Sequence, residues 1–141
     1  VQEEVGLRGA KTSAYRIDPD LGIALDVTMT GDTPKARPVM AVALGDGPAV
    51  KVKDAGMIAS PKVVKLMSDV AAENNIPYQL EVLTGGTTDA AAMQITKSGV
   101  AAGCISIPCR YVHSPSEMID INDLQNAVKL IVKIVEQPIK L

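Results

Sequence analysis

The sequence predicts an α/β fold, in which a layered mixed sheet carries helices on both faces. Runs of branched apolar residues, typical of buried strands, alternate along the chain with segments of helical periodicity. The 141 residues suit one domain or one large piece of a domain, and 47% of them are hydrophobic, enough for a core. Because only 2% are aromatic, that core is expected to consist of Val, Ile, Leu, Ala and Met.

The first half of the chain combines short elements with turn-rich loops. We expect a helix over 6–14, a buried strand over 22–28, loops over 30–38 and 44–48, and a short strand over 49–52. The helix would place Leu7, Ala10 and Ala14 on one side. The strand over 22–28 carries one acid, Asp26, within its apolar run.

The second half alternates longer helices with strands. Helices are expected over 61–74, 88–98 and 120–135, and strands over 78–83 and 100–107. Ser60 is a good N-cap with Pro61 at the first helical position. Gly99 is expected to close the second helix, and Asp120 to cap the third. The inward face of that last helix is expected to carry Leu124, Val128, Ile131, Val132 and Val135.

Charge and cysteine content narrow the class of protein. The formal net charge is −2 and the charges are scattered, which gives no electrostatic case for nucleic acid or an anionic membrane. Cys104 and Cys109 are the only cysteines, and their odd separation in a strand would point them to opposite faces, against a disulfide. We therefore expect a protein of the reducing cytoplasm. We also expect sequence upstream of Val1, because adjacent acids and a glycine turn rarely open a domain; a processed N-terminus is the alternative.

Carboxylates and one histidine are the candidates for chemistry. Glu3 and Glu4 repel each other, so a partly buried pair needs a cation or a shared proton; a solvated acidic turn is the alternative. Asp26 needs a partner or a metal unless it lies at an exposed strand end. His113 is the only histidine, and with these carboxylates it offers the donors that zinc, cobalt or manganese accepts, which supply only part of a two-metal site. A structural or exposed position for His113 stays open.

Two further segments carry polar groups. Gly85-Gly86-Thr87-Thr88-Asp89 is compatible with an anion cradle at a helix N-terminus and equally with a plain turn and a capping threonine. It is not a P-loop, because no Gly-Lys-Ser/Thr follows. Arg110 would neutralise buried carboxylates, contact a substrate, or be an ordinary surface arginine. Cys109 is a poor nucleophile, because no second histidine is present as its base.

Five stretches, taken together and in order, resemble the dinuclear-metal aminopeptidases. This family includes glutamyl aminopeptidases, the tetrahedral TET peptidases and relatives once labelled endoglucanases. The stretches are VQEEVGLRGA at 1–10, ALDVT at 24–28, GDTP at 31–34, GGTTDA at 85–90 and IPCRYVHSPSEMID at 107–120. The resemblance covers essentially the whole chain, and its specificity lies in the ordered set rather than in any single motif.

The resemblance implies an enzyme that hydrolyses the N-terminal peptide bond of peptides through a water activated by two divalent metals. Those metals would be zinc or cobalt, with manganese as a further option. Glu3 would be the general base, Glu4 and Asp26 would each ligate one metal, and His113 would ligate the other. The supporting or substrate-binding residues would be Asp89, Arg110 and Tyr111.

The resemblance also implies that this chain lacks part of the site. In the family, another metal-binding histidine, a bridging aspartate and an inserted assembly domain all precede the Glu-Glu pair. We therefore expect residues 1–141 to be the C-terminal part of the catalytic domain, an incomplete fold of the metal-dependent exopeptidase type. Alone it would bind metal weakly and turn over peptides poorly, whereas the full-length protein would be a homo-oligomer.

Two other functions stay open from the sequence. A glycoside hydrolase would use Glu3 or Glu4 with Asp26 as its carboxylate pair, although a sugar site commonly has aromatic platforms. Cellulose hydrolysis that survives metal chelation would favour it. A non-catalytic assembly module would be indifferent to Glu3→Gln. Lys51 and Lys53 would favour an acidic substrate side chain if they faced the pocket, but surface positions are expected.

Overall fold

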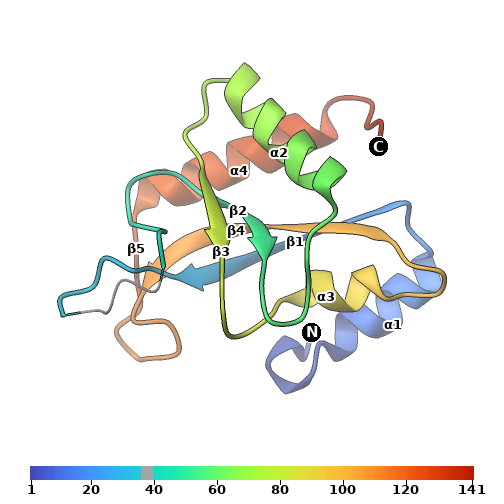
Figure 1. The fold of residues 1–141 in the computed structure, drawn as a ribbon, viewed down its shortest axis with the longest axis horizontal. Helices are drawn as coiled ribbons and strands as arrows, with labels where there is room; N and C mark the ends of the chain where they lie inside the picture. The colour runs from blue at the N-terminus through green and yellow to red at the C-terminus, as the bar shows by residue number, and fades with distance from the viewer. Residues whose placement is uncertain (36–39) are drawn as a thin grey trace.

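The computed structural model describes residues 1–35 and 40–141 and shows one twisted sheet with helices on both sides (Figure 1). The strands are β1 (Leu21–Met29), β2 (Ala49–Lys53), β3 (Gln79–Val82), β4 (Ala101–Arg110) and β5 (Met118–Ile119). The helices are α1 (Arg8–Ile17), α2 (Pro61–Glu73), α3 (Asp89–Gln94) and α4 (Ile121–Val135), preceded by the 3-10 turn η1 (Glu3–Val5). Within the described residues, no helix has the length and apolar content that crossing a membrane requires.

The sheet is mixed, as the sequence predicts. Its order is β1-β4-β2-β3, with the short β5 paired to β4. Strands β1 and β4 are parallel, and so are β2 and β3, whereas β2 and β4 run antiparallel. The sheet therefore consists of two parallel pairs that point in opposite directions. The carboxyl ends of β1 and β4 meet at one edge.

Two apolar layers fix the helices to the sheet. On one face α2 and α4 pack through branched and long side chains, among them Val63, Met67, Leu130 and Ile134, all fully buried. On the other face the packing is built mainly from small residues of β1, α3 and β4, including Ala24, Ala90 and Cys104. The predicted fold class and its aliphatic core are confirmed.

Three predicted details of the elements are wrong. Helix α3 ends at Gln94 with Ile95 as its C-cap, rather than at Ser98 with Gly99, and the chain then turns through Lys97 and Gly99 in left-handed conformations. Strand β4 continues to Arg110, beyond the predicted end at Ile107. Helix α1 starts at Arg8 and ends at Ile17, although its buried residues are the predicted Ala10 and Ala14. Part of the loop predicted over 30–38 lies outside the described residues.

The inward face of α4 also differs from the prediction. The buried residues are Asp123, Ala127, Leu130 and Ile134, whereas Val128, Val132 and Val135 are exposed. The side chain of Asp123 sets this rotation, because it accepts hydrogen bonds from the backbone N–H groups of Gly45 at 2.8 Å and Gly47 at 2.9 Å. A charge with two backbone donors is stable inside the protein, and it shares the buried face of the helix with Ala127, Leu130 and Ile134.

Candidate active site

The parallel pair β1 and β4 brings Asp26 and His113 to the same end of the sheet. Asp26 lies in the second half of β1, and its register partner on β4 is Ser106. Within three residues of the end of β4 at Arg110, the chain has turned through Tyr111 and His113, both in left-handed conformations. Side chains at the carboxyl ends of neighbouring parallel strands converge, so the topology explains their proximity.

The N-terminal turn adds two carboxylates to this end of the sheet. Gln2 and Gly6, both left-handed, flank η1 and fold Glu3 and Glu4 back onto the sheet. A carboxylate oxygen of Glu4 (Oε1) lies 3.2 Å from His113 Nε2, and both side chains are largely exposed. The backbone N–H of His113 donates to Glu117 at 2.7 Å, which holds the turn that carries the imidazole.

These residues line a cleft made of two adjoining hollows. Glu3, Glu4 and Asp26 contribute to both hollows and form the wall between them. The first hollow also contains Asp89, and the second also contains His113. Five of the seven residues proposed from the sequence therefore lie in one cleft.

The carboxylates of the cleft repel one another, and burial together with this repulsion raises the pKa values of Glu3 and Asp26. Burial and the neighbouring Asp26, Glu4 and Asp89 raise the pKa of Glu3, and His113 offsets this only in part. Burial also raises the pKa of Asp26, against the lowering effect of a 2.7 Å hydrogen bond from the Val27 N–H. A cluster of acids with too little positive charge is an environment that favours a bound cation.

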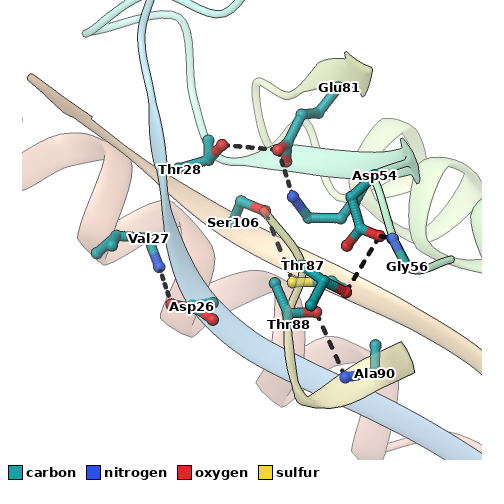
Figure 2. A network of polar contacts seen from close by, with 12 residues as sticks. Asp26, Val27, Thr28, Asp54, Gly56, Glu81, Thr87, Thr88, Ala90 and Ser106 are labelled. Carbon is teal, nitrogen blue, oxygen red and sulfur yellow. Dashed lines mark hydrogen bonds and ion pairs between the residues drawn. The ribbon is translucent and has the colours of Figure 1, made fainter. Parts of the chain in front are cut away.

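Asp89 stands at the first turn of α3. The Thr88 side chain caps this helix by accepting a hydrogen bond from the Ala90 N–H at 3.3 Å, which agrees with the second interpretation of this segment, a turn with a capping threonine. Oxygen Oδ1 of Asp89 is buried and has no partner within the structure. The preceding turn is tied to β2, because buried Asp54 accepts hydrogen bonds from Thr87 and from the Gly56 N–H (Figure 2).

Arg110 and Tyr111 are not among the residues that line the cleft. Arg110 instead donates two hydrogen bonds to Asp32, at 3.1 and 2.7 Å. These bonds hold the pKa of Asp32 well below its usual range. Arg110 thus neutralises a carboxylate of the loop after β1, and Tyr111 is 44% exposed beside it.

A buried ion pair beside the cleft was missed by sequence reasoning. Lys51 is fully buried rather than on the surface, so that expectation was wrong, whereas Lys53 is exposed. The ammonium of Lys51 pairs with Glu81, and Thr28 donates to the same carboxylate oxygen at 2.6 Å (Figure 2). The sequence does contain the two opposite charges, one on β2 and one on β3. They can be recognised as a pair only when the register between the two strands is known.

Comparison with known proteins identifies the family. The model of the M42 glutamyl aminopeptidase family matches residues 1–130. This chain belongs to the M42 family. It is 57% identical over 133 residues to a putative aminopeptidase of Acetivibrio thermocellus, covering 94% of this chain and 40% of that protein.

Solved structures agree with the assignment. An aminopeptidase from the archaeon Desulfurococcus kamchatkensis superposes with a TM-score of 0.94 at 51% identity, covering 98% of this chain and 40% of that one. The Pyrococcus horikoshii TET1 peptidase, which can assemble into a tetrahedron or a large octahedral shell, has a TM-score of 0.78 at 35% identity over 95% of this chain and 38% of its own. The M42 chain thus spans about 40% of the length of these relatives.

The donor set fits a divalent metal in kind but not in its grouping. Glu4, Asp26 and His113 offer the oxygen and nitrogen atoms that zinc, cobalt and manganese accept, and Glu4 and His113 are already adjacent. Within residues 1–35 and 40–141, however, no three such side chains are grouped closely enough to hold an ion. A catalytic zinc normally takes three protein ligands, so a complete site needs further donors.

Proposed function

We propose that this chain supplies the general base and part of the metal-binding set of a metal-dependent aminopeptidase. The observation that carries the proposal is the shared cleft wall of Glu3, Glu4 and Asp26, with His113 beside Glu4, in a chain of the M42 family. The substrates would be peptides with a free N-terminus. A glycoside hydrolase and a purely assembling module have no comparable support.

Each residue has a distinct part in this proposal. Glu4, Asp26 and His113 would hold zinc, cobalt or manganese, and such an ion polarises the peptide carbonyl and lowers the pKa of water. Glu3 would take the proton of the attacking water and pass it to the leaving amine. Its raised pKa supports this role, because a base works best when its pKa is near the working pH. Asp89 would orient the groups around it from the first hollow.

The whole protein would be larger than this chain. Residues 1–141 would form the C-terminal part of a catalytic domain, and the missing donors would come from the part of the relatives that the chain does not match. Alone, the chain would bind metal weakly and turn over peptides slowly. Because the TET1 relative assembles into large shells, we propose that the whole protein is also a homo-oligomer. Both cysteines are free thiols, which supports a cytoplasmic location.

A single substitution tests the role of Glu3. In the whole protein, Glu3→Gln should lower kcat for leucyl p-nitroanilide by about 10²–10⁴-fold, while bound metal and oligomeric state stay unchanged. The matched control is Glu73→Gln, since Glu73 is exposed at the end of α2. Retention of more than a tenth of the activity by Glu3→Gln, at full metal content, would rule out this base.

A further inference from the structure

The second hollow has a distinct chemical character away from its acidic end. Beyond the residues assigned to catalysis, it is lined by the apolar residues Val27, Met29, Leu83 and Val112 and by the turn 85–88. The charged residues among this part of the lining are Lys51 and Glu117. Glu117 is engaged by the His113 N–H. This hydrogen bond leaves Glu117 negatively charged, so within this part of the lining the attraction of an acidic substrate side chain depends on Lys51.

The positive charge of Lys51 is largely balanced by its partner Glu81, although it still partly offsets the effect of burial, which raises the pKa of Asp26 in the same cleft. The side chain of Lys51 is 1% exposed and that of its partner Glu81 is 0% exposed, so water hydrates neither charged group to any extent. The ammonium pairs with Glu81 Oε1, and the hydroxyl of Thr28 donates to the same oxygen. Figure 2 shows Thr28 and Glu81 pointing toward each other across the sheet. The pair has no net charge, and its carboxylate is held in place by both Lys51 and Thr28.

We infer that the enzyme selects peptides with an uncharged, aliphatic first residue, and that Glu81 determines this preference by neutralising Lys51. The inference rests on the proposed function and names the substrate class of the same cleft. An aliphatic side chain gains from contact with the apolar wall. An acidic side chain there loses its hydration and finds no unpaired cation in return.

The test compares substrates and variants in the whole protein with cobalt or zinc added. Leucyl, glutamyl and lysyl p-nitroanilides are compared by kcat/KM, and the wild type should favour leucyl by roughly tenfold or more. Glu81→Gln frees the charge of Lys51, so it should raise the glutamyl-to-leucyl ratio by roughly tenfold. In Lys51→Met/Glu81→Gln no charge remains, and the ratio should return to that of the wild type.

Several outcomes separate this inference from the function on which it rests. A wild-type preference for glutamyl or lysyl substrates overturns it, as does a glutamyl-to-leucyl ratio that Glu81→Gln leaves unchanged. If Glu81→Gln does not fold, the double variant still decides: loss of glutamyl hydrolysis there would mean that Lys51 binds the acid directly. Absence of release from all three substrates defeats the proposed aminopeptidase itself.

Discussion

Replacing Lys51 with methionine should destabilise this chain more than removing any surface lysine. The substitution keeps the aliphatic stem and removes the ammonium. Among the described residues, it leaves Glu81 fully buried with only the hydroxyl of Thr28 to satisfy it. The second carboxylate oxygen of Glu81 has no partner among these residues even in the intact pair. Breaking one side of a buried ion pair costs about 3–5 kcal/mol. Since small domains have only about 5–15 kcal/mol of stability, much of the total is at stake.

The exposed pair between Lys65 and Asp69 supplies a matched control. Their side chains are 74% and 49% exposed, and the two residues are one helical turn apart on α2. Lys65→Met removes the same ammonium from a lysine in a salt bridge, but water replaces the lost partner. Its effect on the free energy of unfolding should fall within the error of the measurement.

Urea unfolding followed by circular dichroism measures both variants. Lys51→Met should show a much lower midpoint at an unchanged slope, and Lys51→Met/Glu81→Gln should recover most of the loss because no buried charge is left unpaired. If Lys51→Met costs no more than Lys65→Met, the pair is not buried as described. The neutral wall inferred for the cleft would then lose its basis.

Three further predictions concern a pH effect, a turn and a thiol. Hydrogen bonds from Arg110 depress the pKa of Asp32, so their stabilisation is present above about pH 4 and fades as the pH falls below it. The urea midpoint of Arg110→Met should therefore lie below that of the wild type at pH 7, with the gap closing toward pH 2; a constant gap would contradict this. Gly47→Ala should lower the melting temperature, because φ is +93° and the new Cβ would lie 2.2 Å from a carbonyl oxygen, whereas Gly85→Ala, with open space around it, should not. Burial raises the pKa of Cys104 to about 11, so a thiol reagent at pH 8 should modify it only after unfolding, and rapid modification of the native protein would refute this.

Much of the fold follows from local sequence patterns. The branched apolar runs identify β1 and β4, and Ser60 with Pro61 marks the start of α2. The rotation of α4 could not be predicted, because the helix is apolar on more than one side. The contact that decides it joins Asp123 to a loop far away in the sequence. Helix α3 ends earlier than predicted and is followed by a left-handed turn at Lys97. A lysine gives no sign of such a turn in the sequence.

The candidate site was predictable in part for a similar reason. Glu3, Asp26 and His113 are conspicuous by residue type and by the order of their motifs. The parallel pairing of β1 and β4 brings Asp26 and His113 together, and the N-terminal turn η1 adds Glu3. The pairing of Lys51 with Glu81 depends on the register between β2 and β3, which no single segment encodes. From its residue type, Lys51 is expected on the surface, whereas the tertiary structure buries it.

Metal dependence of peptide hydrolysis tests the central claim most directly. The whole protein that contains this chain would be stripped with EDTA, assayed with leucyl p-nitroanilide, and assayed again after cobalt or zinc is restored, beside the 141-residue chain alone. We predict that release stops with the chelator, returns with the metal, and stays slow in the isolated chain throughout. Release that survives EDTA would contradict the metal-dependent site. Full activity in a verified monomer of 141 residues would contradict the proposal that part of the site lies outside this chain.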